Sequence, residues 1–346
     1  MRNLAEHGSG TPHGEQGLLD FQERLVKAGL FEGVSVEIDP DPARASAAQV
    51  NVRIRELPLQ QATVGVGYSD ATAQRITFEH LHRRPFGFNA IIKNKLELAR
   101  DASTWSGELT SHTLPGLYRN LLAGGYELLK VNDELRTSLR WRAGRAYDSQ
   151  RIEHIVFGEW LGSKLENLAG LQQANSYSLN FSGAWRRLDS VILPSDGLTV
   201  SGQVGAGWSQ SSTAENGLFT RATARVTVYQ PLGLNWYGTG RLELGHLTAG
   251  NNTGLPDPLL FRAGGDDSVR GYAYRTLGPI KDGVVASGRS LMTASAEVAR
   301  PITPRMPSLW WAAFIDAGNA ADHFNTLDPA LGYGLGLRWR SPVGPL

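Results

Sequence analysis

Cysteine is absent from the 346 residues, and so is any long apolar run. Without cysteine the chain has no disulfide, no thiolate zinc site and no cysteine nucleophile. No stretch approaches the ~18 apolar residues that a membrane-spanning helix needs, and the opening MRNLAEHGSGTPHGEQ has no apolar centre typical of a signal peptide. An excess of one charge is also lacking, because 34 basic residues stand against 33 acidic ones. This balance gives no reason to expect a nucleic-acid partner.

A period of two, with apolar and polar residues alternating, dominates from about residue 60 to the C-terminus. In residues 198–209, for example, Val204 and Trp208 fall on one face while Gln203 and Ser209 fall on the other. These segments have about the ~9–11 residues of a membrane-spanning strand. Their apolar faces often begin or end with Trp, Tyr or Leu, and the opposite faces carry Arg and Glu.

The pattern predicts a mainly-β fold, a transmembrane antiparallel β-barrel over residues 59–346. The alternative is a soluble β-sandwich or solenoid, whose strands also alternate. No fixed repeat length is present, which argues against the solenoid.

A small α+β module is predicted before the barrel. Residues 15–31 have the spacing of an amphipathic helix, and 34–39 and 49–56 alternate as two strands. We therefore predict a helix-plus-hairpin module over residues 14–58, with a boundary at Pro58, and a disordered segment over residues 1–13.

The stretch FRAGGDDSVRGYAYRTLGP, residues 261–279, interrupts the alternation. Its glycines have the wrong offsets for a G-x-S-x-G nucleophile elbow. It lacks the Lys-Ser/Thr pair of a phosphate-binding loop and the spaced oxygen ligands of a calcium site. A solvated surface loop is one reading. Arg270 between small residues, followed by Tyr272 and Tyr274, favours a segment that threads into the barrel and stacks on its wall.

An arginine inside a barrel requires a partner, because an unpaired buried charge is costly. Glu297 and Asp316 both fall on the inward face of successive strands, 291–301 and 309–319. A hairpin of these strands brings both carboxylates to one patch of wall. The alternative is that the two acids merely line a water-filled pore.

Three motifs in this order resemble a known family. GGDDSVRGY resembles the lid-loop signature of the BamA/TamA superfamily of outer-membrane assembly factors. FIDAGN (314–319) resembles the strand motif of that family that carries the lumen acid. LGLRWRSPVGPL (335–346) resembles the motif of its penultimate strand. Residues 14–58 are similar to the last periplasmic POTRA module. The form of the lid motif and the single visible module are more similar to the TamA branch.

The resemblance implies a protein of the bacterial outer membrane, its POTRA part periplasmic, which inserts or exports β-rich clients. Arg270 would pair with Glu297 and Asp316 and pin the lid loop in the lumen. The implied lid motif comprises Gly264, Gly265, Ser268, Val269, Arg270, Gly271 and Tyr272. A loose lateral seam would lie at the first strand, at Val64, Gly65, Val66, Gly67 and Tyr68, and would template client strands.

The resemblance also implies the partners. They are the outer-membrane lipid bilayer, unfolded β-barrel or autotransporter clients and a TamB-like periplasm-spanning protein. No cofactor, metal or catalytic residue is expected. We count roughly fourteen strands where the family's barrels have sixteen, and expect a barrel that is not closed.

Two other functions compete with assembly. One is a secretion or diffusion channel of the same superfamily that exports a polypeptide through its lumen. The other is a barrel enzyme, such as an envelope lipase or protease. The enzyme is disfavoured, because no serine or aspartate has a sequence spacing that would indicate a catalytic pair with a histidine. The histidines considered are His80, His82, His112, His154 and His246.

Overall fold

The computed structural model describes residues 4, 14–39, 41, 47–69, 73–131, 133–149, 151–168, 170–190, 193–281, 283–303, 306–341 and 344–345. The predicted disordered segment 1–13 lies outside the described residues, apart from Leu4. No helix in the described ranges is long and apolar enough to cross a membrane.

The N-terminal module consists of α1 (Glu15–Lys27) and the antiparallel pair β1 (Phe31–Ile38) and β2 (Val50–Glu56). Leu25 of the helix is fully buried, as the apolar spacing predicts. The amide oxygen of Gln22 accepts a hydrogen bond from the Val36 backbone N at 3.3 Å, which ties the helix to the hairpin. Gly29, with a φ of +68°, lies just beyond the helix end and turns the chain toward β1.

One large antiparallel sheet contains most of the remaining chain. Its strands, in sequence order, are β3 (Gln60–Ser69), β4 (Ala73–His82), β5 (Ala90–Ala99), β6 (Ala102–Ser111), β7 (Tyr118–Val131), β8 (Glu134–Asp148), β9 (Ile152–Asn167), β10 (Gly170–Leu188), β11 (Gly197–Ser211), β12 (Gly217–Gly233), β13 (Trp236–Ala249), β16 (Ser290–Thr303), β17 (Met306–Ala321), β18 (Ala330–Ser341) and the two-residue β19 (Gly344–Pro345). Strands that follow one another in sequence lie side by side, and β13 pairs directly with β16. The mainly-β antiparallel fold with about fourteen long strands is therefore confirmed.

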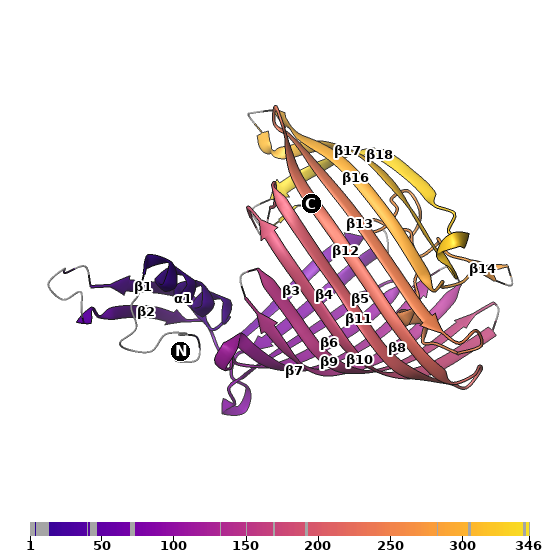
Figure 1. The fold of residues 1–346 in the computed structure, drawn as a ribbon, viewed down its shortest axis with the longest axis horizontal. Coiled ribbons are helices and arrows are strands. Elements are labelled where there is room, and N and C mark those ends of the chain that lie inside the picture. The colour runs from indigo at the N-terminus through magenta and orange to yellow at the C-terminus, as the bar shows by residue number, and fades with distance from the viewer. Residues whose placement is uncertain are drawn as a thin grey trace.

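The sheet curves into a barrel, with the module at one end and the β14 turn at the other (Figure 1). The two outermost strands of the sheet are β3 and β19. Among the residues that the structure describes, no backbone hydrogen bonds pair these two strands with each other. The chain enters β3 directly from the module, so every second hairpin turn lies at the module end of the barrel. The remaining turns lie at the opposite end, which we call the loop end.

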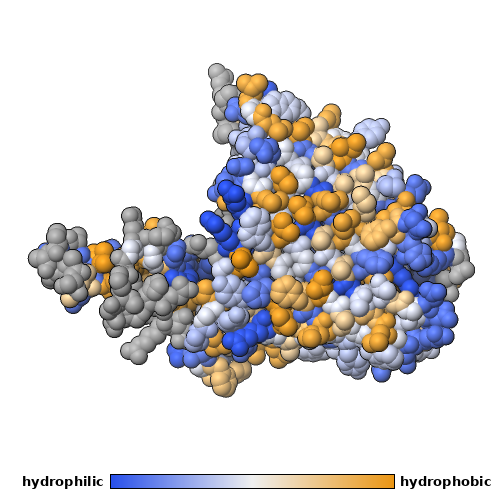
Figure 2. All heavy atoms as spheres, viewed as in Figure 1, coloured by the Kyte–Doolittle hydropathy of each residue, from blue (hydrophilic) through white to orange (hydrophobic). Residues whose placement is uncertain are grey.

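Alternation along the strands sorts the side chains between the two faces of the sheet. In β17, Ile315 points outward and is 54% exposed, whereas the next residue, Asp316, is fully buried inside. Figure 2 shows apolar residues spread over the outer face of the barrel and hydrophilic residues toward its edges. An outward apolar face and an inward polar face are typical of a barrel in lipid.

A 40-residue connection, 250–289, joins β13 to β16 and positions the candidate site. It contains a short 3-10 helix, η5 (Asp257–Leu259), and a small hairpin of β14 (Ile280–Lys281) and β15 (Val284–Val285). Three further 3-10 turns are η3 (Pro85–Gly87), η4 (Pro115–Leu117) and η6 (Phe324–Thr326). We call residues 250–289 the lid loop.

Candidate lid-loop site

The tip of the lid loop folds inside the barrel on glycines. Gly264 has a φ of +102°, and a Cβ atom there would lie 2.5 Å from the carbonyl oxygen of Ala273, so a larger residue does not fit. The Gly264 backbone N donates a hydrogen bond to the Ser268 hydroxyl at 3.2 Å. Gly265 and Gly271 also have positive φ, and the Gly265 N donates to the Tyr272 carbonyl at 2.9 Å. Turns and local hydrogen bonds thus shape the tip.

Arg270 lies at the centre of this tip, against the wall formed by β16 and β17. Its Nε and Nη2 donate to the two carboxylate oxygens of Asp316 at 2.7 and 2.8 Å. Its backbone N donates to Asp316 Oδ2 at 3.0 Å, and its Nη1 donates to Glu297 Oε2 at 2.7 Å. The guanidinium also lies 3.6 Å from the ring centroid of Phe314. This combination of bidentate pairing and ring stacking fixes one orientation of the arginine.

Glu297 is shared between the lid loop and β18. The same Oε2 atom accepts from Arg338 Nη2 at 2.7 Å, so one carboxylate oxygen serves two arginines. Opposite Asp316 in β18 stands Gly332, where a Cβ atom would lie 2.1 Å from the carbonyl oxygen of Arg270. The loop backbone therefore packs directly on β18.

The structure brings together the predicted arginine and both predicted acids. Val269, next to Arg270, is fully buried. The tyrosines differ from expectation, because Tyr272 and Tyr274 each leave 36% of their surface exposed and the ring on the guanidinium is Phe314. Phe314 lies on the inward face of β17, directly opposite Glu297 of β16.

A second ion-pair cluster joins the lid loop to β8, and the sequence did not predict it. Asp257 Oδ2 accepts from Arg136 of β8 at 3.0 Å and from Arg275 of the loop at 2.8 Å. The Ser287 hydroxyl donates to the other oxygen of Asp257. Burial would raise the pKa of Asp257, but Arg275, Arg136 and Ser287 hold that pKa below its ordinary value. Asp257 is therefore a charged, fully partnered residue.

A bidentate ion pair extends this second cluster. Arg262 Nη2 donates to Oε1 of Glu134 in β8 at 2.8 Å, and Arg262 Nη1 lies 2.8 Å from Oε2 of the same carboxylate. Arg136 also pairs with Glu127 of β7 at 2.8 Å. The inward position of Arg136 was readable from strand alternation. Its partner Asp257 lies 121 residues away in an irregular loop, and no spacing rule joins the two.

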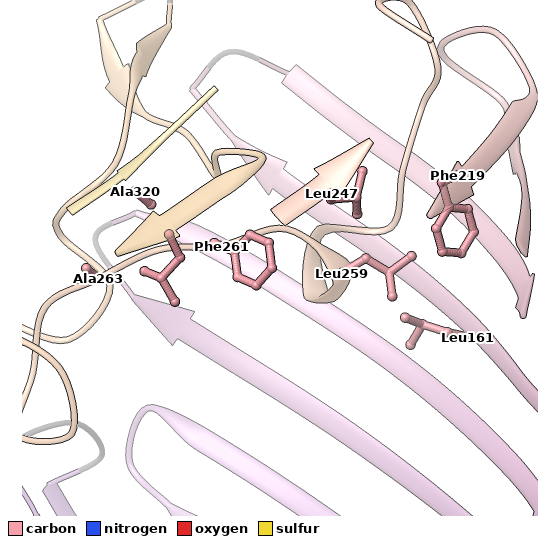
Figure 3. Close-up of a cluster of buried hydrophobic side chains, with 8 residues drawn as sticks. Leu161, Phe219, Leu247, Leu259, Phe261, Ala263 and Ala320 are labelled. Atoms are coloured by element: carbon pink, nitrogen blue, oxygen red, sulfur yellow. The ribbon is translucent and has the colours of Figure 1, made fainter. Parts of the chain in front are cut away.

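Apolar packing fills the space near the second cluster. Figure 3 shows Leu259 and Phe261 of the lid loop among Leu161, Phe219 and Leu247 of the wall. These side chains belong to one buried cluster. The lid loop is thus attached by charges on two separate parts of the wall, β16–β18 and β7–β8, and by an apolar cluster.

The predicted seam residues lie on β3, which pairs only with β4 in the described part of the chain. Val64, Val66 and Tyr68 are 70%, 85% and 74% exposed, and Gly65 and Gly67 occupy the alternate positions. No group of three or more His, Cys, Asp or Glu residues within the described ranges could hold a metal ion.

Comparisons with known proteins agree with this geometry. The Omp85 superfamily domain matches residues 94–346. The structure of BamA from Haemophilus ducreyi lacking POTRA domains 1-3 matches with a TM-score of 0.76 and 15% identity, over 99% of this chain and 76% of that chain. CdiB from Acinetobacter baumannii matches with a TM-score of 0.61 and 16% identity, over 98% of this chain and 64% of that chain. At these identities the likeness is one of fold.

One curated relative is similar in sequence over a shorter stretch. It is the chloroplastic outer envelope protein 80 of Arabidopsis thaliana, 36% identical over 97 residues, which are 25% of this chain. The chain spans only 12% of the length of that relative. The family match covers most of the barrel and agrees with the predicted superfamily. The chain belongs to the Omp85 superfamily, whose domain covers most of the barrel.

Proposed function

We propose that this protein is an outer-membrane assembly factor that inserts or exports β-rich client proteins through a lateral seam. The first strand, β3, would separate from the last strands and offer its backbone to a client strand. The exposure of Val64, Val66 and Tyr68 and the small residues Gly65 and Gly67 support a loosely packed edge. The lid loop would brace the barrel from inside while the seam opens.

One observation carries this proposal: Glu297 accepts from Arg270 of the lid loop and from Arg338 of β18. The brace and the strand nearest the proposed seam therefore share a carboxylate. A change in the position of the loop alters the partners of β18, and the reverse also holds. This sharing supports a loop that regulates the seam.

The module α1–β1–β2 is proposed as the last POTRA domain, on the periplasmic side. Its helix-plus-hairpin composition supports this assignment. A TamB-like periplasm-spanning protein is proposed as its partner, as in the TamA branch that the lid motif resembles. The clients would be unfolded β-barrel or autotransporter proteins.

Replacing Arg270 with alanine tests the brace. We expect Arg270→Ala to lower the rate at which the protein, in proteoliposomes, folds a urea-denatured β-barrel client. Two buried carboxylates would lose their common partner, a defect of about 3–5 kcal/mol in barrel stability. The matched control is Lys281→Ala, which removes an exposed loop ion pair with Asp322. An Arg270→Ala protein with unchanged client folding and unchanged urea stability would contradict the brace.

A secretion channel is the alternative function. A cavity of about 530 Å³ lies inside the barrel on the β3–β8 side, lined by charged residues including Glu79, Lys93, Glu108 and Arg142. This space, lined in part by charged side chains and away from the lid loop, favours passage of a polypeptide through the lumen. Conductance separates the two functions, as argued in the Discussion.

A further inference from the structure

Three arginines point outward from the barrel strands, toward the side where lipid lies. They are Arg145 in β8, Arg187 in β10 and Arg300 in β16, and all three are exposed. Alternation places them on the same faces as the outward residues Trp141, Trp185 and Val298, respectively. All other arginines in the described strands of the large sheet have inward parity.

The three outward arginines all lie near the module-end termini of their strands. Each is within three residues of the end of its strand, since β8 ends at Asp148, β10 at Leu188 and β16 at Thr303. These are all module-end termini. The outward lysines Lys130 and Lys164 lie instead near the loop end. The arginines thus mark one rim.

Aromatic rings accompany each of the three arginines. The Arg145 guanidinium lies 4.5 Å from the ring centroid of Tyr118, and that of Arg300 lies 5.8 Å from the ring of Trp236. Trp185 stands two residues before Arg187 on the same face. Aromatic side chains concentrate where a barrel meets the lipid headgroups. The rings therefore place these cations at the headgroup level.

No carboxylate pairs with Arg145, Arg187 or Arg300 among the residues that the structure describes. Inward arginines behave differently, as Arg142 and Arg225 show by pairing with Glu159 and Glu243. An outward arginine is costly at the middle of a bilayer and close to neutral near its surface. At the rim these guanidiniums keep N–H donors directed to the surroundings, and the anions available there are phosphates.

We propose that Arg145, Arg187 and Arg300 form a belt that binds the phosphate groups of phospholipids in the leaflet on the module side. A guanidinium donates two parallel N–H bonds to a phosphate, and the adjacent ring packs against the glycerol and upper acyl chain. The belt fixes the depth of the barrel relative to the module. This inference concerns lipid contact and stands apart from the proposed assembly activity.

The test compares lipid selectivity of the wild type and the triple variant Arg145→Gln, Arg187→Gln, Arg300→Gln. Both full-length proteins are reconstituted in vesicles of phosphatidylethanolamine and phosphatidylglycerol. Electron paramagnetic resonance then measures how much spin-labelled phosphatidylglycerol, against spin-labelled diacylglycerol, is immobilised at the protein surface. The wild type is expected to prefer phosphatidylglycerol, and the triple variant to lose most of that preference, since one surface cation is worth roughly a fivefold change in binding.

Two controls make the result specific. Lys130→Gln removes an outward cation at the loop end and is expected to leave the preference unchanged. The triple Arg→Lys variant keeps the charge and is expected to retain part of the preference. Heat-modifiable gel mobility verifies folding, and if the triple variant does not insert, the three single Gln variants are expected to show smaller falls. Equal preference in wild type and variants, or an equal fall in Lys130→Gln, would overturn the belt.

Discussion

At the scale of single residues, Glu297 is the point where the lid loop and the barrel wall meet. It is buried, and its Oε2 atom accepts from two arginines. Removing one member of a buried cluster is costly because the remaining charges stay desolvated. The cluster therefore specifies where the loop lies more than it adds net stability.

Gly332 and Gly336 offer a matched pair of substitutions on the inner face of β18. A Cβ atom at Gly332 would lie 2.1 Å from the Arg270 carbonyl oxygen, whereas one at Gly336 would have nothing within 4 Å. Gly332→Ala is expected to push the loop away and lower urea stability by about 1–3 kcal/mol, the usual cost of overpacking. Gly336→Ala is expected to be neutral or slightly stabilising. If the two variants unfold at the same midpoint urea concentration, the loop does not pack on β18.

The residues at this scale were predictable where a regular strand or a recognisable motif carries them. Glu297 and Asp316 were found because alternation in two strands fixes which side chains point inward. Arg270 was singled out by its place in the glycine-rich stretch that interrupts the alternation, and the resemblance to a family motif supported it. Asp257 and Arg275 have no period to reveal them, since both lie in irregular backbone, and their partner Arg136 is far away in sequence. Contacts of this kind depend on the path of the loop.

At the scale of elements, the module and the barrel meet through a buried arginine. Arg83, at the end of β4, is only 7% exposed. Its Nε donates to the Gly29 carbonyl at 2.9 Å and its Nη1 to the Pro58 carbonyl at 2.7 Å. The side chain thus connects the end of the helix, the linker and the barrel. The sequence patterns predicted the module and the barrel, but they could not predict that Arg83 connects the two.

Arg83→Ala is expected to loosen the module relative to the barrel. The chain has no cysteine, so Glu37→Cys and Asp196→Cys provide the only two attachment points for spin labels. The distance distribution between the labels should broaden in Arg83→Ala, because two carbonyls lose their donor. Arg84→Ala, at the exposed neighbouring residue, is the control and should leave the distribution narrow. An unchanged distribution in Arg83→Ala would assign the junction to other contacts.

At the scale of the whole molecule, the lid loop divides the interior of the barrel. Its charged ends attach to β16–β18 and to β7–β8, and its apolar residues fill the space beside β9, β12 and β13. The cavity of about 530 Å³ remains on the β3–β8 side. An interior of this kind obstructs flow without sealing the lumen, and freeing the loop would widen the path.

Conductance in planar bilayers measures this obstruction. The wild type is expected to be mostly closed, with brief openings. The double variant Arg270→Ala, Asp257→Asn removes one anchoring charge at each wall and is expected to give larger and longer openings. Arg270→Ala alone should lie between the two, because the second cluster still holds the loop, and Lys281→Ala should match the wild type. A large, steady pore in the wild type would favour the channel over the assembly factor. A double variant as closed as the wild type would show that the Arg262–Glu134 pair and the apolar packing by Leu259 and Phe261 are enough to keep the loop in place.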